Sequence, residues 1–277
     1  MSIVSSVTPA VTGSDIELRY DDLVALSRCD FHIPAGRTTA VIGPNGSGKS
    51  TLLAAVAGIH EPSTGSVTVL GTAPDDAAAR VAFVPQSTKV NDALPVTVRE
   101  VVMMGRYPSL GFIRRFADAD RAAVDGAIDR LNLTELSARH LRELSGGQRQ
   151  RVFVAQGLAQ DRDLLLLDEP MTGLDGVSAG IVRTVIDEER ASGRTVILTT
   201  HDLEEAQGCD HVILVNGTVV AEGSPDQVLT VETLSAVYRS RVVDKEGRLL
   251  FDDPAHTTHA GTHVHVDRAG GTHPHDE

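Results

Sequence analysis

Nine consecutive residues near the start of the chain have the types and spacing of a phosphate-binding loop. They run Gly43, Pro44, Asn45, Gly46, Ser47, Gly48, Lys49, Ser50 and Thr51, and the first eight match the pattern G-x-x-x-x-G-K-[ST]. Glycines let the backbone wrap closely around an anion, and backbone amides at the start of a helix hold phosphate oxygens. Lys49 can bring a positive charge to the terminal phosphates, and the hydroxyl group of Ser50 can ligate Mg²⁺. The loop therefore predicts nucleotide binding.

Two carboxylates and a histidine follow other apolar runs of the sequence. Asp168 and Glu169 come directly after the leucine run 164–167, and His201 follows the run 195–200. Charges at the end of a buried strand are tolerated where metal or solvent meets them. Because ligands of open α/β sheets bind at the carboxyl ends of the strands, we expect these side chains to converge on the phosphate loop. Considered alone, His201 is better interpreted as a structural residue. Because it is expected to lie beside the phosphate loop, we interpret it as a functional residue instead.

Three further positions have the residue types of a nucleotide site. Gln86 stands where the strand-like run 81–84 passes into a loop. An amide-rich, anion-receptive turn opens the next long helix and consists of Ser145, Gly146, Gly147 and Gln148. Tyr20 offers a stacking face for adenine, although the residue pattern alone favours a half-buried strand aromatic.

Strands and helices alternate along most of the chain and must position these residues. We predict a loose lead-in over residues 1–13, order from about Asp15, and an edge strand at 16–20. Further strands are predicted at 29–33, 39–42, 65–70, 81–84, 164–167, 195–200, 212–215 and 219–222. Helices are predicted at 50–57 and 145–160, and a short helix is predicted after its capping residue Ser224. The segment 87–142 is predicted to be mostly helical. The pattern is that of an α/β fold.

An apolar, aromatic loop interrupts the helical segment. It contains Tyr107, Leu110 and Phe112 in a chain that has only 3% aromatic residues. Such a loop is either a satellite core or a docking surface for another protein, and the sequence leaves both interpretations open.

Composition restricts the partners and the compartment. The chain has 277 residues, a formal charge of −13 and a pI near 5.2, which argue against broad electrostatic binding to nucleic acid or to an anionic membrane. Its two cysteines, Cys29 and Cys209, have no metal-like or C-x-x-C spacing, and the start of the chain does not resemble a secretion signal. No apolar run reaches the roughly 18–20 residues that span a bilayer. We therefore expect a reduced, cytoplasmic protein, and any link to a membrane would have to run through a protein partner.

The composition and the hydrophobic pattern of the sequence change after residue 251. Residues 252–277 lack apolar periodicity and carry six of the eleven histidines, namely His256, His259, His263, His265, His273 and His275. We predict an ordered domain over 1–251 and a disordered, histidine-rich tail over 252–277. Imidazole and carboxylate groups suit zinc, so the tail is a candidate Zn²⁺ site. A solvated low-complexity tail is the alternative.

Taken together, these motifs occur in the order seen in ATP-binding-cassette (ABC) ATPases, and the chain resembles that family over about residues 15–240. The resemblance rests on the phosphate loop and on Gln86, Ser145 to Gln148, Asp168, Glu169, Gly173, Leu174, Asp175 and His201. It implies a P-loop NTPase core with an N-terminal antiparallel β subdomain and a helical signature subdomain over about 87–160. It also implies a head-to-tail homodimer in which each ATP lies between the phosphate loop of one chain and Ser145 to Gln148 of the other.

The resemblance also implies roles for single residues. Tyr20 would stack on adenine, which reverses the structural interpretation above. Ser50 and Asp168 would hold Mg²⁺, with Gln86 linking Mg²⁺ and the attacking water to the permease. Glu169 would act as the general base, His201 would contact the γ-phosphate together with Lys49, and Asp175 would contact the partner chain. Phosphoryl transfer needs mainly positioning and charge compensation, which these groups can provide.

Within the family, a single cassette without membrane spans resembles the ATPase subunit of bacterial importers. The segment Gly105, Arg106, Tyr107 and Pro108 resembles the subgroup that serves zinc and manganese permeases. The resemblance implies ATP-driven import of a divalent metal, most simply zinc, through a separate permease and indirectly an extracytoplasmic binding protein. It places the chain at the cytoplasmic face of the membrane. One alternative is the ATPase of a siderophore, haem or cobalamin importer, and the other is a soluble ABC ATPase. The acidic charge of the chain argues against nucleic acid as a partner.

Overall fold

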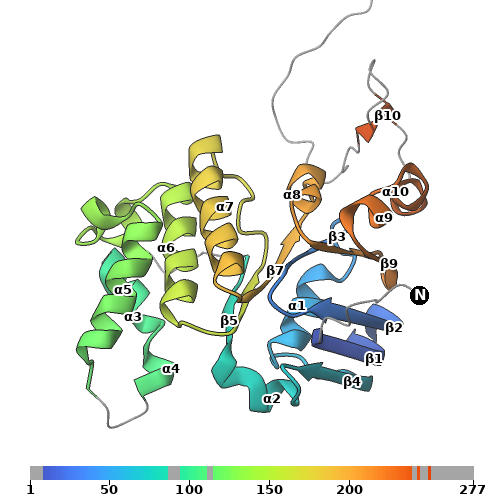
Figure 1. Cartoon of the computed structure of the whole chain (residues 1–277), viewed down its shortest axis with the longest axis horizontal. Helices are drawn as coiled ribbons and strands as arrows, with labels where there is room; N and C mark the ends of the chain where they lie inside the picture. Colours follow the sequence, from blue (N-terminus) through green and yellow to red (C-terminus); the bar gives the residue numbers. More distant parts are fainter. Residues whose placement is uncertain (1–8, 87–93, 111–114, 239–241, 244–248, 251–277) are drawn as a thin grey trace, which may run out of the picture.

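Two β-sheets pack against opposite sides of one helix, α1 (Lys49–Val56). The computed structural model describes residues 9–86, 94–110, 115–238, 242–243 and 249–250. The larger sheet has the strand order β5-β6-β7-β3-β8-β9. Its strands are β5 (Val81–Val84), β6 (Leu164–Leu167), β7 (Thr195–Thr200), β3 (Thr38–Ile42), β8 (His211–Val215) and β9 (Val219–Gly223). All neighbouring pairs in this sheet are parallel except β8 with β9. Figure 1 shows this sheet at the centre of the molecule.

The central strands of this sheet are buried on both faces. Every residue of β3, β6, β7 and β8 is buried, as expected for parallel strands covered on two sides. Successive side chains of β3 point to opposite faces. Val41 packs toward α1, whereas Ala40 and Ile42 pack toward three short helices at residues 203–207, 225–228 and 231–237. This double covering holds the carboxyl ends of the strands in one fixed row.

The smaller sheet is antiparallel and has the order β2-β1-β4. Its strands are β1 (Pro9–Tyr20), β2 (Leu23–Pro34) and β4 (Thr64–Val69). The predictions that order begins near Asp15 and that 16–20 is an edge strand were wrong, because β1 begins at Pro9 and pairs on both sides. Val11 is paired with Ile33 of β2 and with Val69 of β4. A second short antiparallel pair joins β10 (Val242–Val243) to β11 (Leu249–Leu250).

The helices form a lobe beside the larger sheet and short caps along it (Figure 1). The lobe contains α3 (Val98–Met104), α4 (Tyr107–Leu110), α5 (Asp118–Arg130) and α6 (Gly146–Ala159), and α7 (Gly176–Ala191) packs beside α6. The shorter helices are α2 (Pro74–Ala77), α8 (Leu203–Gln207), α9 (Pro225–Val228) and α10 (Val231–Val237). Single 3₁₀ turns lie at η1 (Ala78–Arg80), η2 (Thr134–Leu136) and η3 (Leu141–Glu143). The mixed α/β core, antiparallel subdomain and helical subdomain confirm the predicted fold class.

The apolar loop of the helical lobe divides between core and surface. Leu110 is buried, so it belongs to the core and does not extend a docking surface. Tyr107 is 54% exposed and contacts the Phe116 ring edge to face, with 6.1 Å between the ring centroids. Phe112 and the tail 252–277 lie outside the described residues. Across the residues that the structure describes, no helix is long and apolar enough to cross a membrane.

Candidate functional site

The phosphate loop leaves the carboxyl end of β3 and opens α1, as its sequence predicts. Gly43 adopts a φ of 153°, where an added Cβ would lie 2.0 Å from the carbonyl oxygen of Val215. Gly48 caps α1 in the left-handed region with a φ of 106°, which is strained for residues that carry a Cβ. The buried Lys49 ammonium donates to the carbonyl oxygens of Gly43 at 2.8 Å and Pro44 at 3.1 Å. The loop thus holds a cation at the start of a helix, where anions bind.

Asp168 follows β6 and faces the first turn of α1. Its Oδ1 atom accepts hydrogen bonds from the hydroxyl groups of Ser50 at 3.0 Å and Thr199 at 2.6 Å. Only 4% of Asp168 is exposed. Two donors therefore fix this buried carboxylate next to the phosphate loop.

Glu169 is the next residue and has an unusual backbone conformation. Its φ of 48° is in the left-handed region, which costs free energy for a residue with a Cβ and often marks a functional position. The backbone amide of Glu169 donates to Thr199 Oγ1 at 2.8 Å. Its Oε2 atom accepts from Gln86 Nε2 at 2.8 Å and from Thr172 Oγ1 at 3.0 Å. The strained turn points the two adjacent carboxylates to different sets of partners.

A cavity of about 330 Å³ opens over these groups. Its walls bring together the antiparallel sheet, the phosphate loop and the ends of β5 and β6. It is lined by Tyr20, Leu23, Val24, Ala25, Asn45, Gly46, Ser47, Gly48, Lys49, Ser50, Thr51, Gln86 and Glu169. Of the predicted convergence, Glu169 lines the cavity with the phosphate loop and Asp168 contacts Ser50 of that loop, and Gln86 lies in the same cavity.

His201 follows β7 directly, as predicted, but it does not line this cavity. The backbone before it is held by Thr200, whose hydroxyl group donates to Glu205 Oε2 at 2.6 Å and accepts from the amide of Asp202 at 3.0 Å. Asp202 caps α8 by accepting from the amide of Glu204 at 2.7 Å. These bonds set where the chain turns after β7 and leave His201 exposed at the surface.

The residues Ser145 to Gln148 lie in the helical lobe and not in the cavity. Ser145 caps α6: its hydroxyl group accepts from the amide of Gln148 at 3.2 Å, and its own amide donates to Gln148 Oε1 at 3.0 Å. Ser145 and Gly146 are exposed at the start of α6.

Asp175 plays the same capping role for α7. Its carboxylate accepts from the amide of Ser178 at 2.8 Å and from the Ser178 hydroxyl group at 3.1 Å. These hydrogen bonds to Ser178 lower the pKa of Asp175, because they stabilise its ionised form. The carboxylate therefore stays charged and exposed at the surface of the chain.

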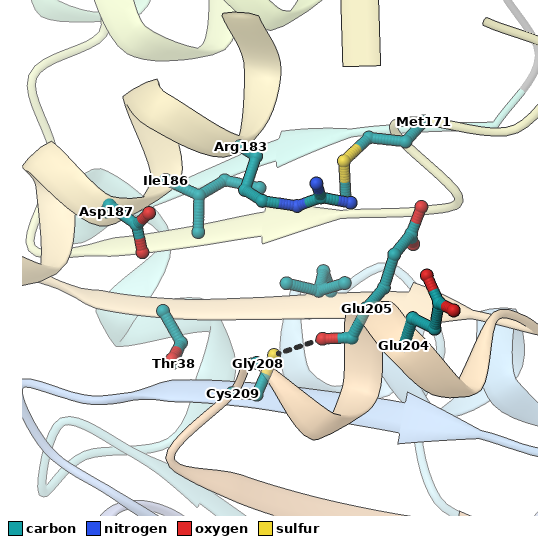
Figure 2. A pocket seen from close by; sticks show the side chains of 10 residues that line it. Thr38, Met171, Arg183, Ile186, Asp187, Glu204, Glu205, Gly208 and Cys209 are labelled. Atoms are coloured by element: carbon teal, nitrogen blue, oxygen red, sulfur yellow. Dashed lines mark hydrogen bonds between the residues drawn. The ribbon is translucent and has the colours of Figure 1, made fainter. Parts of the chain in front are cut away.

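A second cavity of about 340 Å³ lies between α7, β7 and α8, on the side of β7 away from the phosphate loop. Figure 2 shows Arg183 reaching across it toward Met171 and Glu205, with Cys209 at its floor. Burial raises the pKa of the Glu205 carboxyl group, and burial raises the pKa of the Cys209 thiol to about 12. The thiol is therefore neutral at physiological pH, which makes it a packing group and not a nucleophile.

Thr199 and Thr172 contact the carboxylates and were missed at the sequence level. Thr199 lies in the buried run of β7, where its hydroxyl group had no visible partner in the sequence. The signal that could have revealed it is its place one residue from the end of a strand next to β6. Among the residues that the structure describes, no group of three or more histidine, cysteine, aspartate or glutamate side chains could hold a metal ion. The six tail histidines lie outside that part of the chain.

Comparison with known proteins places these features in one family. A family profile described as ABC transporter matches residues 26–172. The zinc transport system ATP-binding protein TroB of Treponema pallidum is 39% identical over 87% of this chain and 91% of its own length. The manganese transport system ATP-binding protein MntA of Synechocystis is 38% identical over 82% and 89%, respectively. A solved chain from a metal-chelate type ABC transporter in an inward-facing conformation has a TM-score of 0.73 and 29% identity, over 86% of this chain and 94% of that chain.

The fold described above agrees with these matches. The resemblance inferred from the sequence is thereby confirmed. The chain belongs to the ABC transporter family and is an ATP-hydrolysing cassette.

Proposed function

We propose that this chain hydrolyses ATP in the 330 Å³ cavity to power the import of a divalent metal ion. The triphosphate would lie along residues 43–51, with Lys49 turning from the loop carbonyls to the terminal phosphates. Ser50 Oγ and Asp168 Oδ1, only 3.0 Å apart, supply the hard oxygen ligands that Mg²⁺ prefers. Bound Mg²⁺ would neutralise charge on the phosphate oxygens.

Glu169 is the general base in this proposal. Its carboxylate lines the cavity, and Gln86 and Thr172 fix its Oε2 atom, so Oε1 is the oxygen available to accept a proton from water. Thr199 holds the Glu169 backbone and the Asp168 side chain at the same time. His201 would contact the γ-phosphate from the end of β7.

A second copy of the chain would complete each site. The amides at the start of α6 are an anion-binding element, yet they do not line the cavity of their own chain. A head-to-tail homodimer would bring Ser145, Gly146, Gly147 and Gln148 of one protomer to the phosphates bound by the other. Asp175 at the start of α7 would then contact the partner and couple the two sites.

The observation that carries the metal assignment is the relationship to metal transport ATPases. TroB and MntA are named for zinc and manganese transport, and each aligns with more than four fifths of this chain. Within that class we favour zinc, with manganese as the alternative. The ion would cross a separate membrane permease supplied by an extracytoplasmic binding protein, with this chain on the cytoplasmic face. The exposed Tyr107 is our candidate contact with the permease.

Metal uptake in intact cells tests this function. Cells that carry only the Glu169→Gln form should lose uptake of ⁶⁵Zn or ⁵⁴Mn, and the isotope that is lost identifies the ion. Uptake of a ferric siderophore and of cobalamin should be unchanged. Loss of siderophore or cobalamin uptake with normal zinc and manganese uptake would assign the ATPase to a different importer.

We also propose that the tail binds Zn²⁺ through His256, His259, His263, His265, His273 and His275. The support is their residue type alone, since imidazole is a common zinc ligand. Calorimetric titration of Zn²⁺ into the full chain and into a chain ending at Phe251 would test it. Equal zinc uptake by the two forms would exclude the tail as the site.

A further inference from the structure

Tyr20 ends β1 at the edge of the nucleotide cavity, and the ring of His60 lies against it. The two ring centroids are 4.4 Å apart and the ring planes are inclined by 31°, so the rings make a close, tilted contact. Tyr20 lines the cavity, whereas His60 does not. Because Tyr20 remains 48% exposed, His60 covers only part of the ring and leaves the cavity side open.

His60 is anchored to the same helix that carries the phosphate loop. The backbone amides of Ile59 and His60 both donate to the carbonyl oxygen of Ala54 in α1, at 2.9 and 3.2 Å. Gly58, with a φ of 73°, makes the turn that brings this segment back over the end of α1. The backbone of His60 is thus fixed relative to the phosphate loop through α1.

The imidazole of His60 has a ring contact with Tyr20 and one buried nitrogen. Its Nε2 atom is buried, and among the described residues it has no hydrogen-bond partner. A hydrogen-bonding role in the core does not account for this nitrogen. The contact that the structure does provide is the stack with Tyr20.

The neighbouring surface has the character of a base-binding shelf. Leu23 and Val24 are 68% and 39% exposed beside Tyr20 and line the same cavity. Exposed apolar groups next to a phosphate loop suit the flat, apolar face of a nucleobase. The shelf needs a Tyr20 ring that already has the correct orientation, since a freely rotating ring would lose conformational entropy on binding.

We propose that His60 is a positioning residue for the base of ATP. It backs the Tyr20 ring so that the open face is presented to adenine, giving a stack of imidazole, phenol and base. The inference rests on the proposed ATP site, and it adds to it a residue that selects for nucleotides with a stacking base. The phosphate contacts of residues 43–51 are independent of His60.

Nucleotide affinity measured with two ligands tests the proposal. His60→Ala should raise the Kd and KM for ATP about two- to tenfold, the range expected for one aromatic pair, with kcat unchanged. The Kd for inorganic tripolyphosphate, which has no base, should not change. His60→Phe should restore ATP affinity because it restores the stack. Ile59→Ala, at an adjacent side chain that is 66% exposed, is the matched control and should resemble wild type.

A double-mutant cycle separates this inference from the ATP site itself. Tyr20→Ala should weaken ATP binding, and His60→Ala should add little in that background. If Tyr20→Ala leaves ATP affinity unchanged, adenine does not stack on Tyr20, and the proposed role of His60 is refuted as well. If Tyr20→Ala weakens binding while His60→Ala does not, the ATP site stands and the positioning role is refuted. Equal loss of ATP and tripolyphosphate affinity in His60→Ala would also refute it, since that indicates a general distortion of the loop.

Discussion

Gln86 and Glu169 are joined by a hydrogen bond of 2.8 Å between Nε2 and Oε2, although 83 residues separate them in the sequence. The bond is possible because β5 and β6 are parallel neighbours, with Val84 paired to Leu167, so both residues leave the sheet at the same edge. It ties the orientation of the Glu169 carboxylate to the position of the chain after β5. A displacement of Gln86 would therefore alter the hydrogen bonding of the proposed general base.

Replacing Glu169 by glutamine should nearly abolish turnover while ATP still binds. The amide oxygen of glutamine can accept the hydrogen bonds from Gln86 and Thr172, but the amide cannot take a proton from water. Loss of a general base typically costs about 10²–10⁴-fold in rate. Phosphate release and ATP binding would be measured on purified Glu169→Gln protein, with the exposed Glu232→Gln as control. Wild-type turnover in Glu169→Gln would remove Glu169 from the mechanism.

Replacing Thr199 by valine should reduce both stability and turnover. The buried Thr199 hydroxyl group donates to Asp168 and accepts from the Glu169 amide, so valine leaves that buried amide without its acceptor. A buried polar group left unpaired costs about 1–3 kcal/mol, and the two carboxylates lose their common support. Urea unfolding and ATP hydrolysis measure the two effects.

Thr39→Val is the matched control for this change. Thr39 is also fully buried, in the adjacent strand β3, but its hydroxyl group has no hydrogen-bond partner among the described residues. Valine at this position should be neutral or stabilising, because no hydrogen bond is lost. If both variants lose equal stability, the hydrogen bonds of Thr199 do not contribute specifically to the free energy of unfolding.

The sequence predicted the row of strand ends because buried parallel strands are visible as apolar runs. Asp168, Glu169 and His201 follow such runs, and the sheet places two of them as expected around the phosphate loop. The first half of β1 was missed because Pro9 and Gly13, which are typical of loops, flank a run of only three residues, 10–12. Pairing with both β2 and β4 overrides that weak local preference. At Gly13 a Cβ would lie 2.1 Å from the Phe31 ring, so the glycine serves close packing within the sheet.

Contacts between distant side chains were the part that the sequence could not supply. The Thr199 hydroxyl group and the stack of Tyr20 with His60 depend on the relative positions of separate elements. Neither has a spacing rule that a single sequence would reveal. Leu110 was grouped with Tyr107 because both are apolar, and only the packing of α4 separates the buried residue from the exposed one.

Glu205 should make stability depend on pH in a defined direction. Burial raises its pKa above the ordinary 4.5, while the hydrogen bond from Thr200 and the charges of Arg183 and His201 oppose the shift. The folded state therefore favours the protonated carboxyl group. Its stabilising contribution is complete below about pH 4.5 and is lost as the pH rises through the raised pKa.

The variant Glu205→Gln removes this ionisation and keeps an oxygen that can accept from Thr200. Its unfolding free energy relative to wild type should therefore increase as the pH rises from about 4.5 through the raised pKa. Urea unfolding across that range measures the difference. Glu204→Gln, at the neighbouring exposed side chain in Figure 2, should show no such trend. If the difference in unfolding free energy between Glu205→Gln and wild type stays constant with pH, the pKa of Glu205 is not raised in the folded state.

Asp120 should be the most costly carboxylate to remove from the helical lobe. Its side chain is 1% exposed and accepts from Arg106 Nη2 at 2.9 Å, and it also accepts from the amide of Ala117 at 2.9 Å. Arg106 in turn donates to the carbonyl oxygens of Ala159 and Gln160, so this pair fastens the start of α5 to the end of α6.

Breaking this pair by Asp120→Ala should lower the unfolding free energy by about 3–5 kcal/mol, because it leaves a largely buried guanidinium without its counterion. Asp118 lies two residues before Asp120 and forms an exposed ion pair with Arg121. Asp118→Ala should therefore cost less than about 1 kcal/mol. Replacing both buried partners, in Arg106→Met with Asp120→Leu, should recover much of the loss, since no charge then remains buried. Chemical denaturation of the three variants gives the comparison. Equal effects of Asp120→Ala and Asp118→Ala would mean that water reaches the Arg106 guanidinium and that the pair contributes no more than a surface contact.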